Sequence, residues 1–197
     1  MSDPTASEAD AVLDFWFGAP GSSEYGSARK AWFSKDGAFD AAIRERFGAL
    51  VERALRGELD AWGDEPRSSL AQILLLDQFT RNAFRGTARS FAGDARALAA
   101  ASRMVGSRQD VALPPFMRGF VYLPFEHAEG LAMQDEAIRL FNRLVSEASE
   151  HANMLDYAHQ HRAVIERFGR FPHRNGILGR ESTAEEIAFV KQPGSAF

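Results

Sequence analysis

Three polar stretches of the sequence carry side chains suited to acid–base chemistry or to anion binding. In the stretch 74–87, Asp77 interrupts the most hydrophobic predicted helix, and Arg81 and Arg85 follow on the same helical face because residues four apart are neighbours. A charge in such a helix needs a partner, so an Asp77–Arg81 ion pair that closes the helix end explains the pattern without a function. Alternatively, Arg81, Asn82 and Arg85 direct hydrogen-bond donors into a cleft.

The second stretch, 122–131, holds two acids and a histidine. Pro124 is expected to start a helix, which would place Glu126 and Glu129 in its first turn with His127 between them. The helix dipole favours acids in a first turn, and this effect by itself explains the presence of both glutamates. Alternatively, Glu126 or His127 takes part in proton transfer. The order Glu-His-x-Glu differs from the Glu-x-x-His of di-iron bundles, so we expect no metal and no other cofactor.

The third stretch, 161–180, has a local positive charge, with five arginines and one acid. Glycine, proline and asparagine residues predict turns that hold it as a rigid loop. Within one turn of that loop, His173, Arg174 and Asn175 supply a titratable ring, a guanidinium and an amide. Arginine outnumbers lysine 20 to 3 in the whole chain, so the clustering of the arginines, rather than their identity, indicates anion binding.

The composition is that of an ordinary globular protein. The chain has 197 residues, 45% hydrophobic and 25% charged, which fits one domain over 1–197 with its own core. A net charge of −4 argues against nucleic-acid binding through overall charge. The lack of cysteine excludes disulfides, thiol catalysis and cysteine-ligated metals. No stretch approaches the ~20 apolar residues of a membrane span, and the acidic start is unlike a signal peptide, so we expect a cytoplasmic protein without a membrane partner.

Apolar spacing predicts helices throughout the chain. In a helix over 39–55 the i, i+4, i+8 pattern places Phe47 in the core. Further helices are expected at 5–17, 66–79, 95–105, 114–124, 126–145 and 148–168 and after Ser182, with capping boxes at Thr5/Glu8 and Ser182/Glu185. No alternating run is long enough for a strand, so we predict an all-α fold of seven to eight or more helices, as a helical bundle or a stack of helical hairpins.

Five motifs of this chain resemble those of one bacterial family. They are VLDFWFG (Val12–Gly18), LDQFTRNAFRGT (Leu76–Thr87), PFEHAE (Pro124–Glu129), RFGRFPHRNGILGR (Arg167–Arg180) and PGSAF (Pro193–Phe197). The chain is therefore identified as similar to the domain-of-unknown-function family numbered 924.

The resemblance has implications for the fold and leaves the chemistry open. It implies a degenerate stack of tetratricopeptide-like (TPR-like) helical hairpins, and no established activity, cofactor or substrate. The chain departs from the family pattern at three positions, where Thr80 replaces a proline, Phe125 a leucine and Ala128 a serine. Without that proline the helix expected at 66–79 can continue, and without the serine one hydroxyl donor is missing.

Three functions are compatible with these residues, and we favour the first. As a binding module, the protein would hold an anionic small molecule or a peptide carboxylate on its arginines. As an enzyme, it would use Glu126 or His173 as a general base beside an arginine anion clamp, in hydrolysis or proton transfer. As structural locks, the same groups would only join helices, in a protein with a protein–protein interaction role.

Isolated charges in the most apolar parts of the chain would be costly, so we expect the polar stretches to meet in one site. The acids of the second stretch are too few for the arginines, and this predicts a guanidinium free to face an anion. The predicted site residues are Asp77, Arg81, Asn82, Arg85, Glu126, His127, Glu129, Arg170, His173, Arg174 and Asn175.

Overall fold

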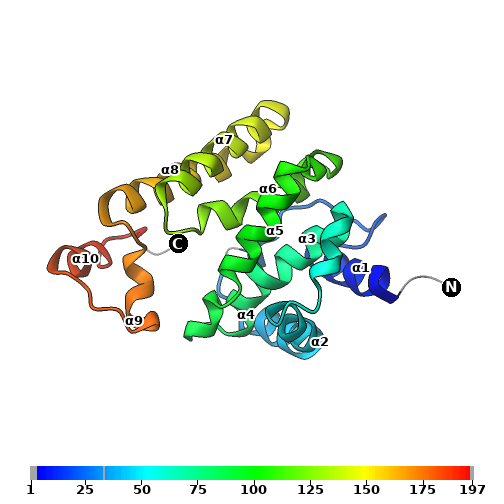
Figure 1. The fold of residues 1–197 in the computed structure, drawn as a ribbon, viewed down its shortest axis with the longest axis horizontal. Coiled ribbons are helices and arrows are strands. Elements are labelled where there is room, and N and C mark those ends of the chain that lie inside the picture. Colours follow the sequence, from blue (N-terminus) through cyan, green and yellow to red (C-terminus); the bar gives the residue numbers. More distant parts are fainter. Residues whose placement is uncertain (1–3, 33, 196–197) are drawn as a thin grey trace.

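The structure is a computed structural model that describes residues 4–32 and 34–195, and its helices are shown in Figure 1. No strand occurs in these two ranges, which confirms the predicted all-α fold. The side-chain cap predicted at Thr5 and the last two residues of the PGSAF motif lie outside the described part of the chain.

The helices follow the predicted order with shifted boundaries. The α-helices are α1 (Pro4–Phe17), α2 (Gly37–Leu55), α3 (Pro66–Leu74), α4 (Thr80–Ala83), α5 (Asp94–Gly106), α6 (Pro115–Glu126), α7 (Leu131–Glu147), α8 (Ala152–Phe168), α9 (Asn175–Leu178) and α10 (Ala184–Phe189). Between them lie the π-helical segment η3 (Leu75–Phe79) and the short 3₁₀ helices η1 (Lys30–Trp32), η2 (Asp60–Asp64), η4 (Ala88–Phe91), η5 (Gln109–Ala112), η6 (Ser149–His151) and η7 (Pro172–Arg174).

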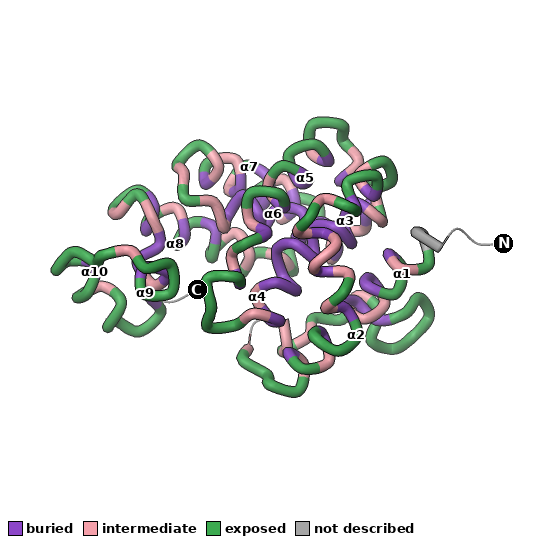
Figure 2. Tube along the Cα trace, turned by 60° about the horizontal axis from the view of Figure 1, so that its bottom comes forward, coloured by how far each residue is buried: buried purple, intermediate pink, exposed green. Residues whose placement is uncertain are grey.

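The segments α3, η3 and α4 form one continuous helix through the centre of the protein (Figure 2). Residues 69–80 are all buried, as expected for a helix that is apolar on nearly every side. Thr80, at the position where a proline would interrupt the helix, donates its hydroxyl hydrogen bond to Leu76 O at 2.7 Å. The predicted central helix and its continuation beyond Thr80 are both confirmed.

Aromatic side chains join this central helix to its neighbours. Phe47 of α2 is 3% exposed, and its ring centroid lies 5.1 Å from that of Phe15 and 5.2 Å from that of Phe79. Such pairs of rings contribute beyond their buried area. The predicted core position of Phe47 is confirmed.

Pro124 does not start a helix, and this corrects the prediction for the second polar stretch. Helix α6 runs through Pro124 and ends at Glu126, and Gly130 then precedes α7. A proline one turn before a helix end removes one hydrogen bond, and the burial of every residue from Met117 to Glu126 holds the helix together across it. Glu126 therefore lies at the carboxyl end of a helix, where the helix dipole disfavours a negative charge.

The C-terminal segment, from the end of α8 to α10, forms a small lobe at one side of the protein (Figure 1). Helix α8 ends at Gly169, whose φ of +70° favours glycine. The lobe has its own apolar contacts, made by Val164, Ile165 and Phe171 with the partly buried Phe168 and Phe189.

The capping box of α10 lies one residue later than predicted, at Thr183 and Glu186. The hydroxyl of Ser182 instead accepts a hydrogen bond from Asn175 Nδ2 at 3.0 Å, and Thr183 is the residue that caps α10. Asn175 begins helix α9 rather than forming the predicted turn with Gly176.

Helix α7 packs against both α6 and α8. A TPR-like repeat and a single domain remain predictions. Among the described residues, no helix has the length and apolar character needed to span a membrane.

Candidate functional site

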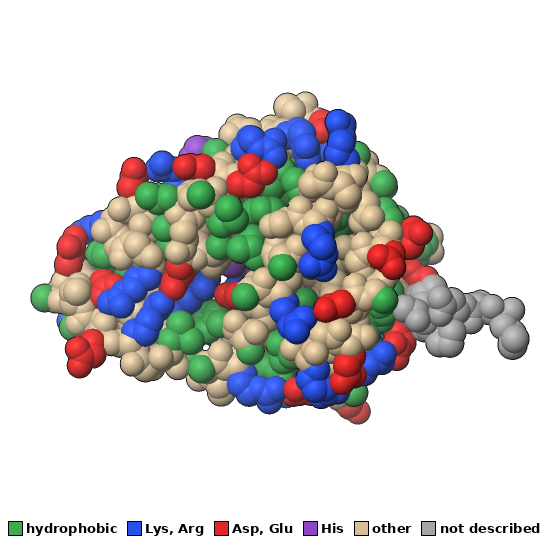
Figure 3. All heavy atoms as spheres, viewed as in Figure 1, with side chains coloured by type: hydrophobic (Ala, Val, Ile, Leu, Met, Phe, Trp, Pro, Cys, Tyr) green, Lys and Arg blue, Asp and Glu red, His purple; other side chains and the backbone are tan. Residues whose placement is uncertain are grey.

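Polar side chains from several elements meet where the C-terminal lobe approaches η3, α5 and the end of α6. We call this group the histidine cluster, and it consists of Asp77, Arg81, Asp94, Glu126, His127, His161, His173 and Arg174. Figure 3 shows a hollow between the lobe and the rest of the protein, with a histidine side chain inside it and basic and acidic side chains at its rim.

The most buried member of the cluster is Asp77, which is fully buried in η3. One carboxylate oxygen, Oδ1, lies 2.7 Å from His127 Nδ1 and 3.1 Å from Arg81 Nη1, while Gln78 donates to Oδ2 at 2.5 Å. Burial by itself would raise the pKa of Asp77, but the charge of Arg81 and the hydrogen bonds of His127 and Gln78 hold that pKa well below its usual range. Because Asp77 is ionised, His127 carries its proton on Nδ1 and donates it, which leaves Nε2 as a base.

Arg81 pairs with both Asp77 and Asp94, and a close helix approach makes this possible. Its guanidinium donates to Asp94 Oδ1 at 2.9 Å and Oδ2 at 3.2 Å, and to the backbone oxygen of Asp77 at 2.6 Å. A Cβ atom at Gly93 would lie 2.0 Å from Leu76 O, so only glycine lets the start of α5 come this near η3. The pairing with two acids raises the pKa of Arg81 although burial opposes it.

Arg174 has much weaker pairing than Arg81, although it is 6% exposed. One hydrogen bond joins its Nη1 to Asp94 Oδ2, at 3.3 Å, and its buried Nε has no hydrogen-bond partner among the described residues. The guanidinium carbon lies 4.4 Å from the ring centroid of Phe171 and 4.8 Å from that of Phe91. Burial and the charge of Arg81 lower the pKa of Arg174 to about 10, although the charge of Asp94 opposes this.

A buried carboxyl and a histidine face each other beside Asp77. Glu126 Oε1 lies 3.1 Å from His161 Nδ1, which is also 2.9 Å from Tyr157 O. Burial and the charge of Asp77 raise the pKa of Glu126 to about 8, while burial lowers the pKa of His161 to about 3. At neutral pH both groups are therefore uncharged, and Glu126 is a proton donor.

The other histidines of the cluster are uncharged as well. Burial and then the charge of Arg174 lower the pKa of His173 to about 4, and burial lowers the pKa of His127. The ring centroids of His127 and His161 are 6.3 Å apart, and Phe171 contacts the rings of His161 and His173 at 5.4 and 5.7 Å. The structure thus brings Arg81, Glu126 and His127 near His173 and Arg174, and the role of these residues as one site stays a prediction.

Two of the predicted arginines lie elsewhere, which is a correction. Arg85 donates to Asp40 of α2 at 2.7 and 2.9 Å, and Arg170 donates to Glu186 of α10 at 2.6 and 2.8 Å. Both join helices through paired charges. Nothing in the spacing of the sequence brings Asp40 near Arg85 or Glu186 near Arg170, because both pairs arise from the packing of separate helices.

Glu129, Asn82 and Asn175 were also predicted site residues, and their side chains make contacts outside the cluster or none with it. Glu129 accepts hydrogen bonds from Arg180 at 2.6 and 2.9 Å and from the backbone nitrogen of Phe171 at 2.7 Å, so it fixes the loop before α9. Asn175, the first residue of α9, accepts a hydrogen bond from Arg180 Nε, just after that helix, at 2.9 Å. Asn82 is buried at the end of α4, and no hydrogen bond of the described residues joins its side chain to the cluster.

Two members of the cluster were missed from the sequence. Asp94 lies in the first turn of α5, a common place for an acid, and nothing in its spacing indicates a contact with Arg81. His161 lies on the buried face of α8 in the spacing Ala158, His161, Val164, and this pattern could have identified it as a histidine among core positions.

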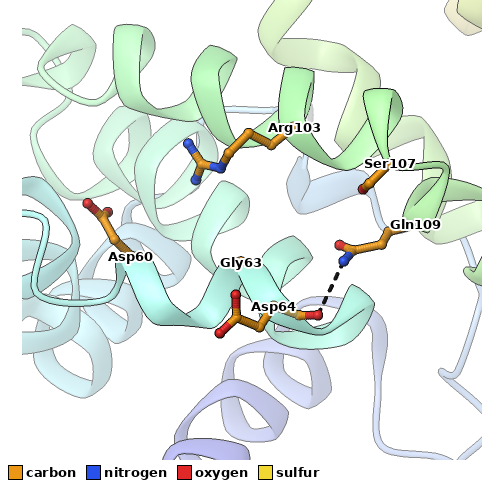
Figure 4. Close-up of a pocket in the computed structure, with 6 residues that line it drawn as sticks. All are labelled: Asp60, Gly63, Asp64, Arg103, Ser107 and Gln109. Atoms are coloured by element: carbon orange, nitrogen blue, oxygen red, sulfur yellow. Dashed lines mark hydrogen bonds between the residues drawn. The ribbon is translucent and has the colours of Figure 1, made fainter.

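The cluster combines groups that can donate or accept protons, its histidines and Glu126, with two guanidinium groups, those of Arg81 and Arg174. Within the described residues, no group of three or more His, Asp or Glu side chains is arranged to hold a metal ion. A surface hollow of about 650 Å³ lies elsewhere, between η2 and α5, where Gln109 Nε2 donates to Asp64 O at 3.2 Å (Figure 4). It shares no residue with the cluster, and its Asp60 is already paired with Arg96.

Comparison with known proteins adds a family and a related fold. The family described as "Bacterial protein of unknown function (DUF924)" matches residues 12–194. The solved structure of the protein of unknown function ATU0120 from Agrobacterium tumefaciens is 43% identical, with a TM-score of 0.84, over 95% of this chain and 98% of that one. A search of curated proteins found no match.

Proposed function

The chain belongs to the bacterial DUF924 family, and we propose that its histidine cluster binds a small anionic ligand at the guanidinium of Arg174. The observation that carries this proposal is the incomplete pairing of a buried arginine. A buried charge is costly unless it is paired and hydrogen-bonded. Arg174 has one long hydrogen bond, and in the described ranges its Nε has no hydrogen-bond partner.

The contrast between the two arginines of the cluster supports this assignment. Arg81 and Arg174 share Asp94, but Arg81 contacts both of its oxygens and also pairs with Asp77. The pKa of Arg81 is raised and that of Arg174 is lowered. An anion on Arg174 would supply the charge that the protein does not, and a carboxylate suits the fork of the guanidinium.

The surroundings of Arg174 favour a small ligand that enters from the side of Asp94. Phe91 and Phe171 pack against the guanidinium and restrict the side chain before a ligand binds, which reduces the entropy lost on binding. The side chains of Arg81 and Asp94 are 19% and 24% exposed, so solvent reaches this side of the cluster. A free carboxylate and a peptide carboxylate have the same chemistry here, and ligand size separates them in the test.

The test is a titration with acetate, benzoate, inorganic phosphate and an acetylated tripeptide, followed by thermal unfolding and calorimetry. We expect at least one of these anions to raise the Tm of the wild type and Arg174→Gln to weaken its binding by about tenfold or more, the factor for ~1.4 kcal/mol. Arg167→Gln is the matched control, because Arg167 pairs with Glu185 at the surface of the same lobe. If no anion binds, or if Arg174→Gln binds as the wild type does, the cluster is a structural lock.

A further inference from the structure

We infer that this site is also catalytic, with His127 as the general base that activates a water molecule for hydrolysis of an acyl group on the bound anion. The inference rests on the proposed function, because the anion held at Arg174 would place the acyl group. Three features of the described residues support it: the Asp77–His127 pair, the open nitrogen of His127, and the neutral acid at Glu126.

Asp77 fixes His127 in the form that a general base needs. The 2.7 Å contact to Nδ1 sets the tautomer and the ring orientation, and Gln78 and Arg81 hold the carboxylate in turn. His127 also follows the last residue of α6, where the helix dipole stabilises the imidazolium that forms when the base accepts a proton.

The other nitrogen of His127 is available. In the part of the chain that the structure describes, no hydrogen bond ends on Nε2, and the side chain is 15% exposed while that of Asp77 is fully buried. Gln78 already donates a hydrogen bond to the Asp77 carboxylate and Arg81 pairs with its charge, so a structural lock would not require a titratable ring at this position. Asp77 lies in the π-helical segment η3, and such segments occur frequently at functional sites.

Glu126 supplies the complementary acid. It is 3% exposed, its Oε2 has no hydrogen-bond partner among the described residues, and its high pKa keeps it protonated at neutral pH. Glu126 can therefore donate a proton while the neighbouring His127 accepts one, the arrangement expected of a general acid and a general base in one site.

The reaction balances without a further reactant. His127 Nε2 takes a proton from water, and the water oxygen bonds to the carbonyl carbon, whose π electrons move to its oxygen. When the carbonyl re-forms, the bond to the leaving group breaks and Glu126 protonates the leaving group; the imidazolium then returns its proton to Glu126. In this reaction water is the nucleophile, His127 is its general base, and the products are an acid and an alcohol or amine.

The experiment compares two chromogenic esters, the neutral 4-nitrophenyl acetate and the anionic mono-4-nitrophenyl ester of glutaric acid. We expect the wild type to hydrolyse the anionic ester with the higher kcat/KM. His127→Gln should lower kcat for both esters by ~10²–10⁴-fold, the usual contribution of a general base. Arg174→Gln should raise KM for the anionic ester alone, and His159→Gln, at an exposed position of α8, should change nothing.

The outcomes separate the two proposals. The catalytic inference is wrong if His127→Gln hydrolyses the esters as the wild type does, or if the wild type does not exceed the buffer rate. The binding proposal still stands in either case if anions bind in an Arg174-dependent way. If hydrolysis depends on His127 without preference for the charged ester, the anion site is wrong. If His127→Gln fails to fold, the wild type is treated with diethyl pyrocarbonate, and mass spectrometry measures the fraction of His127 that is carbethoxylated. The loss of hydrolysis must then be proportional to that fraction.

Discussion

His127 Nδ1 lies 2.7 Å from the Oδ1 atom of Asp77, a residue 50 positions earlier in the chain. This contact joins the end of α6 to the π-helical segment of the central helix. The site therefore forms only when these two core elements pack against each other, and a change in either residue affects both stability and chemistry.

Asp77→Asn should lower the free energy of unfolding by ~3–5 kcal/mol, the usual cost of breaking a buried charge pair. Arg81 would lose one of its two acids and His127 its charged acceptor. Urea unfolding measures the change. The control is Asp10→Asn, since Asp10 pairs with Arg67 at the surface and should cost less than ~1 kcal/mol. Equal effects for the two variants would contradict the buried pair.

Arg174→Met should leave the free energy of unfolding unchanged or raise it, because it removes a buried charge that the protein pairs poorly. Arg81→Met should instead cost ~3–5 kcal/mol, since it leaves Asp77 and part of Asp94 without their cation. Urea unfolding of both variants checks this order. A larger loss for Arg174→Met than for Arg81→Met would show that Arg174 is the structural lock.

Glu126→Gln should change how stability depends on pH. The carboxyl has a pKa of about 8 in the folded protein against its ordinary 4.5, so the folded state binds the proton more tightly. This stabilising effect is complete below pH 4.5 and is lost as pH rises to about 8, at no more than ~1.4 kcal/mol per pH unit. Neither Asp77, with its low pKa, nor His161, with a pKa of about 3, titrates in this window.

The measurement for Glu126 is the free energy of unfolding of wild type and variant between pH 4 and 9. Glu126→Gln should gain stability relative to the wild type as pH rises, because glutamine has no proton to lose. Parallel curves for the two proteins would mean that Glu126 is ionised in the folded state at neutral pH.

Phe47→Ala should cost ~3–5 kcal/mol, as for other buried phenylalanines. The ring lies between Phe15 and Phe79, so its removal leaves a cavity beside the central helix. Tyr157→Ala, at a side chain that is 52% exposed, should stay within ~0.5 kcal/mol. A loss below ~1 kcal/mol for Phe47→Ala in urea unfolding would show that this face of α2 is not core.

The sequence predicted the helices well where apolar spacing determines their extent. It predicted them less well where tertiary packing determines where a helix begins or ends. The spacing around Phe47 indicated both helix and core. Pro124 indicated a helix start, but the buried apolar residues on both sides of it kept α6 intact, and this is a tertiary effect. The π-helical geometry of η3 has no pattern in the chain that would predict it.

For the site, the sequence identified the polar residues that interrupt apolar stretches, but it did not identify all the residues that pair with them. The spacing predicted the Asp77–Arg81 pair, because it lies within one helix. Partners from other helices, such as Asp94 for Arg81 and Asp40 for Arg85, depend on the close approach at Gly93 and on the packing of α2, which spacing does not encode.

The most direct test of the anion site is a crystal of the wild-type protein soaked in bromide, with the ion located by its anomalous scattering. We predict a bromide peak within hydrogen-bond distance, ~3.5 Å, of an Arg174 guanidinium nitrogen, on the side of the cluster where His127 Nε2 is open. The same peak should be absent from Arg174→Gln crystals. Peaks confined to the exposed arginines, with none at Arg174, would contradict the account.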